Sequence, residues 1–322
     1  MIFFITVLRA LAAGLITNAH YTGVYPTDLI ANGGLIGDVI FFAVSGYCLY
    51  QVKGSFPKWY GKRLIRCYLP VWLITAVFML LGFYSLKENS ALWWYAYPTN
   101  YHFVASIVVL YIPFYIIMKW DALRKRIPVV MAGIALIYLA VYLFVYDKSY
   151  YHIDTVREPM IRFLFMESML LGAWFRQSDA KFRNRFSWWQ VVAVLAAFVA
   201  YFASKLLFSK LSALSGLQIV NQILIFVLLY LVFRLFAGLD GKLEKMPAPV
   251  RGCIDFIAKI TLEIYVVQYV LIDLVRPLFG FPLNWFALTG SILLAATALH
   301  YAVAGLEKFW SLAAKKLKGS KV

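Results

Sequence analysis

The sequence predicts an all-α fold, a polytopic bundle of about ten transmembrane helices in a single membrane domain that covers residues 1–322. Of the 322 residues, 63% are hydrophobic and only 14% are charged, and the mean hydropathy is +0.77. Soluble domains are about half apolar and about a quarter charged. Apolar stretches of about 20 residues, enough to cross ~30 Å of hydrocarbon, recur along the chain. They are continuously apolar rather than alternating, which favours helices over the strands of a β-barrel.

The predicted spans follow one another with short polar breaks. Because backbone N–H and C=O groups must be satisfied inside hydrocarbon, each span is expected to be a helix. The first span, 2–20, and the second, 31–50, each contain ionisable side chains, whereas the third to fifth contain no charged residue. The third to tenth predicted spans are residues 67–85, 101–118, 128–146, 160–175, 188–206, 218–236, 252–275 and 283–304.

Basic residues are concentrated in alternate gaps between these spans. The second, fourth, sixth and eighth gaps and the C-terminal tail, together with Arg234 at the end of the eighth span, hold 22 of the 31 Lys and Arg residues. Cytoplasmic loops carry such an excess, so both termini are predicted to be cytoplasmic, in agreement with an even number of spans. This topology also explains the net charge of +16. No soluble basic surface with base-reading side chains is apparent, so a nucleic-acid partner is not expected.

Several other kinds of site are not indicated. Cys48, Cys67 and Cys253 are the only cysteines, and they lie in spans or near the inner face, so no disulfide framework is expected. No metal-ligand spacing and no Gly-rich phosphate loop is present, so we expect no metal and no permanently bound cofactor. The first apolar run has no basic residue before it and is interrupted by Arg9, so it is not expected to be a cleaved signal peptide.

The first span contains two ionisable side chains, Arg9 and His20, which are 11 positions apart. This spacing is close to three helical turns, about 16 Å along the axis, and places both side chains on one face. An Arg at membrane depth is costly and usually faces a bundle interior or a wet cavity, so the two can line one path. In the simpler interpretation Arg9 extends toward the inner surface and His20 only closes the helix at the interface.

In the second span, Asp38 and Ser45 are seven residues apart and therefore share a face. Asp38 is a candidate to hold Arg9 or His20 through a charge-assisted hydrogen bond. Its alternative role is a purely structural ion pair, and Ser45-Gly46 can simply allow close helix contact.

Arg63 and Arg66 are three residues apart at the predicted cytoplasmic boundary before the third span. Two guanidinium groups so placed can bind phosphates bidentately. Ordinary anchoring to anionic membrane lipid is the competing explanation.

Further candidates lie in the later spans. Glu167, inside the sixth span, must be protonated or paired, for example with Arg162 or Arg9. Lys259 and Glu263 are four apart, so an ion pair between them is expected. Tyr265 and Gln268 face similarly and are candidates to line a substrate path.

Two histidines outside the first span have structural explanations. His102 follows an aromatic-rich segment, interpreted as an interfacial belt, and is a second-rank site candidate. His300, in the last span, is interpreted as an interhelical hydrogen-bonding residue. The belt consists of Trp93, Trp94, Tyr95, Tyr97 and Tyr101.

Together these motifs resemble the acyltransferase-3 family of integral membrane O-acyltransferases, the type that acetylates bacterial polysaccharides. Arg9, ten residues and His20 match the family's first-helix pattern. Gly37 to Tyr47 is similar to its Gly-Val-Asp-Leu-Phe-Phe-Val-Leu-Ser-Gly-Phe signature, and Arg63-x-x-Arg66 before Pro70 is similar to its Arg-x-x-Arg-x-x-x-Pro element. Weaker similarity continues through Tyr101 to Phe103, Arg162 to Gly172 and Thr261 to Tyr265. Thr6 and Gln268 depart from the pattern, because the family often has Asp and His there.

The resemblance implies transfer of an acyl group, with acetyl expected, from cytoplasmic acyl-CoA to a sugar hydroxyl of an exported or lipid-linked glycan. It also implies a multi-pass protein of the bacterial inner or plasma membrane. His20, Arg9 and Asp38 are then the expected catalytic residues, and Arg63 and Arg66 the expected donor-binding residues.

Two other functions would also use membrane-buried charges. A transporter or flippase for a lipid-linked sugar needs them around a central path. A glycan polymerase would usually need a larger outer loop than the predicted gaps allow. A requirement for acyl-CoA separates acyl transfer from both.

Overall fold

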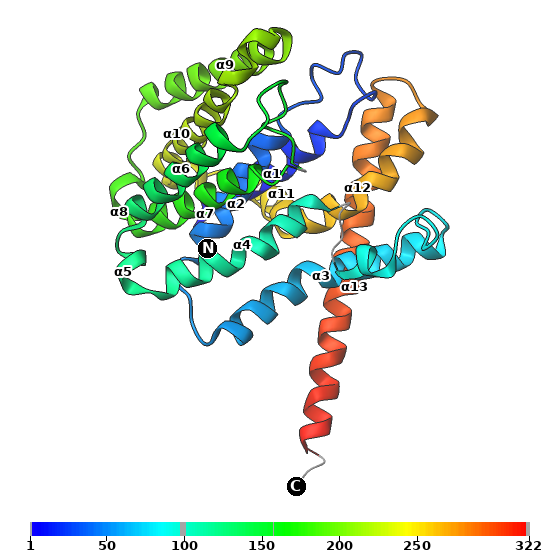
Figure 1. The fold of residues 1–322 in the computed structure, drawn as a ribbon. Coiled ribbons are helices and arrows are strands. Elements are labelled where there is room, and N and C mark those ends of the chain that lie inside the picture. Colours follow the sequence, from blue (N-terminus) through cyan, green and yellow to red (C-terminus); the bar gives the residue numbers. More distant parts are fainter. Residues whose placement is uncertain (1, 97–100, 157, 320–322) are drawn as a thin grey trace. The chain divides into compact units, whose positions relative to one another are not determined.

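A computed structural model describes residues 2–96, 101–156 and 158–319, and every regular element within these ranges is helical (Figure 1). The chain divides into two compact units, which are described separately. Unit 1 contains Met1–Ile16, Gly33–Tyr60 and Ser106–Ala258, and unit 2 contains Thr17–Asn32, Gly61–Ala105 and Lys259–Val322. The all-α prediction is confirmed, and the single domain stays a prediction.

Unit 1 is built around a close pair of helices, α2 (Gly34–Leu49) and α7 (Ile161–Gln177). They approach closely because glycine lies at the contact. A Cβ at Gly46 would come within 1.8 Å of the Met169 carbonyl oxygen, and a Cβ at Gly172 within 1.8 Å of the Ala43 carbonyl oxygen. Small residues let membrane helices approach in this way. Phe42 and Phe165 stack beside the contact with ring centroids 4.2 Å apart.

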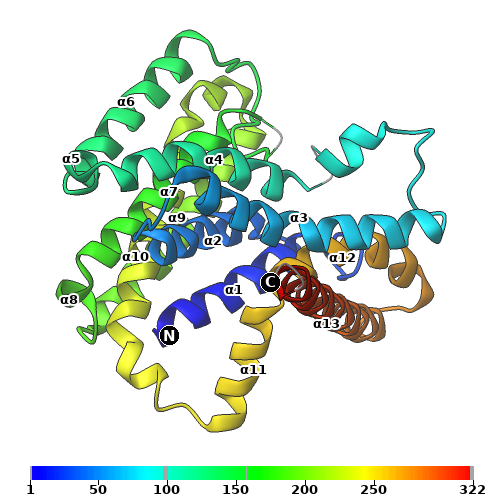
Figure 2. The same cartoon turned by 90° about the horizontal axis from the view of Figure 1, so that it is seen from below.

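Among the remaining helices of unit 1, α6 and α10 contact this pair. Helices α9 and α10 pack against each other, and α6 and α10 pack against α7. Figure 2 labels α11 in yellow after α10. These elements are α1 (Phe3–Ala19, up to Ile16), α4 (His102–Lys119, from Ser106), α5 (Asp121–Arg124), α6 (Ile127–Phe144), α8 (Asp179–Phe182), α9 (Trp188–Lys210), the 3-10 helix η2 (Ser212–Leu217), α10 (Ile219–Leu243) and α11 (Ala248–Lys259, up to Ala258).

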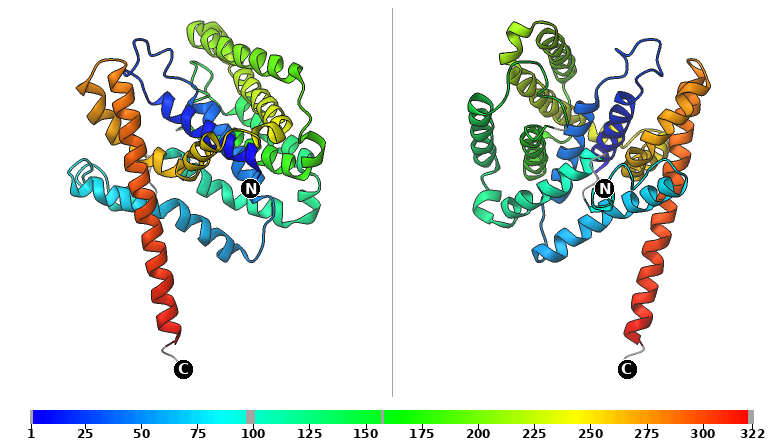
Figure 3. Two further views of the ribbon diagram at one scale, coloured as in Figure 1. Left: turned by 180° about the vertical axis from the view of Figure 1, so that it is seen from behind. Right: turned by 45° about the vertical axis from the view of Figure 1, so that its right-hand side comes forward.

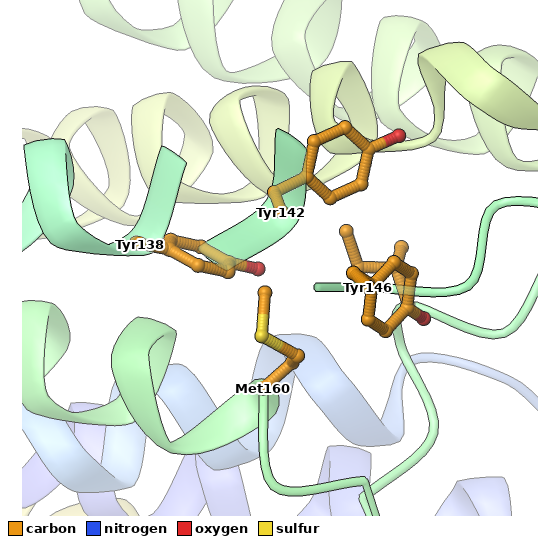
Figure 4. Close-up of a cluster of buried hydrophobic side chains, with 5 residues drawn as sticks. Tyr138, Tyr142, Tyr146 and Met160 are labelled. Carbon is orange, nitrogen blue, oxygen red and sulfur yellow. The ribbon is translucent and has the colours of Figure 1, made fainter. Parts of the chain in front are cut away.

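A satellite core of unit 1 lies between α6 and the loop before α7. Tyr138 and Tyr142 lie one turn apart on α6, and Tyr146 follows the helix; the three gather around Met160 (Figure 4). Ile153 completes the buried set. The loop is therefore attached to the helices by aromatic packing.

Unit 2 pairs α12 (Thr261–Val275) with α13 (Leu283–Gly319), the long C-terminal helix in Figure 3. The segment after α1 is tied to this pair by the Tyr21 hydroxyl at 3.0 Å from Thr289 Oγ1 and by Asn284 Nδ2, which donates to the Val24 carbonyl at 2.9 Å. The other elements are α3 (Phe56–Leu80, from Gly61), the π-helix η1 (Leu92–Ala96) and the 3-10 helix η3 (Arg276–Leu278).

The membrane character of the chain is confirmed by helix length and composition. Six described helices, α3, α4, α6, α9, α10 and α13, are long and apolar enough to cross a bilayer, and α1 and α2 are shorter apolar helices. All ten predicted spans contain a helix. A count of ten transmembrane helices and cytoplasmic termini stay predictions.

Two predicted boundaries are wrong. The third span was expected at 67–85, but α3 begins at Phe56, because Pro57 suits a first helical turn and the following basic residues continue the helix. It ends at Leu80 because Gly82 adopts a φ of 81° and its neighbour Phe83 donates back to the Phe78 carbonyl, which satisfies the helix end. The ninth span, 252–275, is two helices, α11 and α12, separated at Ile260.

Candidate active site

His20 lies immediately after the C-terminal end of α1, in unit 2. Its position depends on Asn18, whose Nδ2 donates to the carbonyls of Ile30 at 2.8 Å and Asn32 at 3.0 Å. The Tyr25 hydroxyl donates to Asn18 Oδ1 at 2.6 Å, so the loop after the helix is closed onto the helix end. Asn18 was not among the residues predicted from the sequence, although Asn is common where a chain leaves a helix.

The imidazole of His20 makes an edge-to-face contact with the aromatic ring of Tyr269. The ring centroids of His20 and Tyr269 are 4.9 Å apart with an interplanar angle of 67°. The His20 side chain is half-buried and forms no hydrogen bond or ion pair with any residue that the structure describes. A general base or a nucleophile requires a ring nitrogen that is not engaged in another hydrogen bond, and His20 meets this requirement among the described residues.

Three tyrosines form a cluster around this contact, and we call Tyr101, Tyr265 and Tyr269 the tyrosine cluster. The Tyr269 ring centroid is 5.7 Å from that of Tyr265 and 5.9 Å from that of Tyr101. The Tyr101 hydroxyl donates to the Val266 carbonyl at 3.2 Å, and Tyr265 accepts from the Phe103 N–H at 3.4 Å. The cluster is thus fixed by backbone hydrogen bonds.

From the sequence, Tyr101 was predicted to belong to an interfacial belt. Its side chain is instead fully buried within unit 2. Its hydroxyl lies 3.3 Å from that of Tyr84, which follows α3. Burial raises the pKa of the Tyr84 hydroxyl. Trp94 is also buried, whereas Tyr97 lies outside the described residues.

Gln268 belongs to the same helix as Tyr265 and Tyr269. Its side chain is completely buried, and neither Nε2 nor Oε1 has a hydrogen-bond partner among the described residues. Gln268 was selected as a candidate from the sequence, but the sequence could not show that its amide has no hydrogen-bond partner among the described residues.

Glu263, at the start of α12, pairs with a different residue from the one expected. His300 Nδ1 lies 2.8 Å from Glu263 Oε1, and this pair joins α12 to α13. The expected ion pair of Glu263 with Lys259 does not form, because Lys259 ends α11 and the break at Ile260 removes the regular four-residue spacing. The expected interhelical bond of His300 is confirmed.

Arg63 and Arg66 lie on α3, in unit 2. Both residues were predicted to lie at the membrane boundary before the third span, but they lie inside helix α3. They are three residues apart and therefore occupy neighbouring positions on one face of the helix. Arg66 is exposed and Arg63 is half-buried. This arrangement can present two guanidinium groups to one phosphate-bearing ligand.

The other candidates lie in unit 1. Arg9 Nη2 is 3.8 Å from Cys48 Sγ, and Asp38 and Glu167 are buried. Among the described residues Asp38 forms no ion pair with Arg9, and Glu167 forms none with any basic group; Glu167 Oε1 also has no hydrogen-bond partner there. Ser45 is half-buried beside the close contact of Gly46 with α7, as expected if this pair permits helix approach.

Comparison with known proteins agrees with the motifs. No curated protein and no solved structure matches the chain. The family of the acyltransferase domain, Acyl_transf_3, matches residues 2–305, which is nearly the whole sequence. The chain therefore belongs to the acyltransferase-3 family and is a membrane acyltransferase.

Proposed function

We propose that this protein moves an acyl group, with acetyl expected, from cytoplasmic acyl-CoA to a sugar hydroxyl of an exported or lipid-linked glycan. The observation that carries the proposal is His20, a half-buried imidazole held by a closed loop against Tyr269, with no hydrogen bond to the described residues. Family membership supports acyl transfer, and the imidazole supplies a group that can accept the hydroxyl proton.

In the proposed reaction, the acceptor hydroxyl oxygen bonds to the thioester carbonyl carbon while its proton passes to the His20 imidazole. The carbon–sulfur bond then breaks, and the sulfur takes that proton to leave as the CoA thiol. In the alternative covalent route, the acyl group is first bonded to the His20 imidazole and is then transferred to the acceptor hydroxyl. Both routes conserve atoms and charge and need no redox partner.

Arg63 and Arg66 are proposed to bind the phosphates of acyl-CoA, because paired guanidinium groups match phosphate oxygens. Arg9 and Asp38 remain proposed catalytic residues, and Ser45, Glu167 and Tyr265 proposed members of the substrate path. The proposed location is a bacterial inner or plasma membrane, with ten spans and both termini in the cytoplasm. The alternative, a flippase for a lipid-linked sugar, would move its cargo without consuming acyl-CoA.

The first experiment uses inside-out membrane vesicles from the native host, given CoA carrying a labelled acetyl group. We expect label in extracted lipid-linked or polymeric glycan with the parent protein, and at least a 100-fold lower rate with His20→Ala, in keeping with the size of general-base effects. His152→Ala, at equal protein level, is the matched histidine control, because His152 lies in unit 1 and bonds the Tyr150 carbonyl.

Loss of labelling in His20→Ala alone would support the mechanism. Full labelling in His20→Ala would remove His20 from it, and no labelling by the parent despite acceptor glycan would favour the flippase.

A further inference from the structure

Gln268 is an unusual residue for the interior of unit 2. It is 0% exposed, and both amide atoms lack partners among the described residues. Burying an amide without a hydrogen bond costs about 2–7 kcal/mol, depending on the reference state, and proteins pair the large majority of such groups. An apolar side chain of the same length would avoid this cost, so the amide calls for a functional explanation.

A second buried glutamine in the same chain shows how the fold satisfies this side chain elsewhere. Gln218, also 0% exposed, accepts from the His152 and Ile153 N–H groups at 3.0 Å each, and its Nε2 donates to the Tyr150 carbonyl at 3.0 Å. Burial of a glutamine therefore does not by itself leave it unpaired in this protein.

Gln268, whose amide has no partner among the described residues, lies on the same helix face as the residue that contacts the candidate catalytic histidine. Tyr265, Gln268 and Tyr269 occupy positions i, i+3 and i+4 of α12, which share one face. Tyr269 is the residue whose ring contacts His20. The surrounding tyrosine cluster is largely buried, so a hydrogen bond formed there would act with little competition from water.

We propose that Gln268 donates, from Nε2, the hydrogen bond that stabilises the oxyanion formed during acyl transfer at His20; this rests on the proposed function. When the hydroxyl oxygen bonds to the thioester carbonyl carbon, the carbonyl oxygen takes the negative charge, and it returns that electron pair when the carbon–sulfur bond breaks. The same oxygen carries the charge if His20 is the nucleophile. A neutral amide with no ground-state partner loses no competing bond when it meets the oxyanion.

The deciding variant is Gln268→Met, which keeps an unbranched side chain and removes the donor. In the vesicle assay we expect kcat to fall about 10²–10³-fold, the effect of losing one oxyanion donor, with little change in the KM for acyl-CoA. Gln268→His keeps a ring N–H and is expected to retain most of the activity.

Thermal unfolding in detergent separates this role from a structural one. Gln268→Met should have the parent's midpoint or a higher one, because it removes an unpaired buried amide. Gln218→Met is the matched control and should have a lower midpoint, because it leaves two backbone N–H groups without an acceptor.

A loss of kcat in Gln268→Met without loss of stability would establish the proposed role. Parental kcat in that variant, or a fall in stability like that of Gln218→Met, would overturn it while leaving acyl transfer by the parent intact. If the parent transfers no acyl group, the proposed function itself fails, and the role of Gln268 fails with it.

Discussion

At the scale of single residues, helix geometry rather than distance along the chain decides which charged side chains pair in unit 2. Lys259 and Glu263 have the spacing of a helical ion pair, but a break at Ile260 separates them, and Glu263 pairs with His300 from α13. The Glu263 side chain is 8% exposed in this pair and that of His300 is 36% exposed. A buried carboxylate that lost this partner would have to be protonated or remain uncompensated.

We therefore predict that Glu263→Ala lowers stability by about 1–3 kcal/mol, through loss of a largely buried hydrogen bond and its unpaired partner. The measurement is thermal unfolding of the purified protein in detergent. Lys259→Ala changes the residue that sequence spacing had suggested as the partner of Glu263, and it should leave the midpoint of thermal unfolding unaltered. A larger effect for Lys259→Ala than for Glu263→Ala would show that the pair with His300 does not form.

At the scale of elements, the α2–α7 contact depends on two glycines that meet backbone rather than side chains. A carbonyl oxygen cannot rotate away as a flexible side chain can, so an added methyl group must push the helices apart. The motif residues Asp38 and Ser45 lie on the same helix, so separation of this contact would also move them.

Gly46→Ala or Gly172→Ala is accordingly expected to destabilise unit 1 by at least about 1–3 kcal/mol, as overpacking does. Gly133→Ala on α6 is the control, because its Cβ would meet nothing within 4 Å and alanine favours a helix. Thermal midpoints and the monodisperse fraction after extraction report the effect. Equal stability of all three variants would contradict the close approach of α2 and α7.

At the scale of the whole molecule, the charge pattern predicts that α11 lies on the cytoplasmic side, together with the gaps and adjoining span end that carry 22 of the 31 Lys and Arg residues. Cys253 on α11 is exposed and can report this position directly. The exposed Glu88, between α3 and η1, belongs to a gap predicted to face outward.

A variant with Cys253 as its one cysteine should react with a membrane-impermeant maleimide in inside-out vesicles and be protected in right-side-out vesicles. A variant with Glu88→Cys, and serine at the three native cysteine positions, should show the opposite pattern. Labelling of both from the same side would mean that the number of crossings between them is not the one predicted.

Composition and apolar length were enough to predict a helical membrane protein, because exposing backbone in hydrocarbon is costly. The resemblance of the ordered motifs to a known family added the expectation of acyl transfer. The motifs at Arg9, His20 and the later positions resembled the acyltransferase-3 family, the match over residues 2–305 confirmed that resemblance, and Gln268 was selected as a departure from the family pattern. Helix ends were less predictable, since the basic first turns of α3 are helical without being apolar.

Only the tertiary structure decided which side chains meet. The contact of His20 with Tyr269 and the pairing of Glu263 with His300 join residues far apart in the chain. The burial of Tyr101 and the lack of a partner for the Gln268 amide among the described residues depend on what surrounds those side chains. Local sequence sets hydropathy and helical register, whereas hydrogen-bond partners and close glycine contacts arise when separate helices pack. The sequence alone therefore determined the class of protein, and packing determined how its candidate site is built.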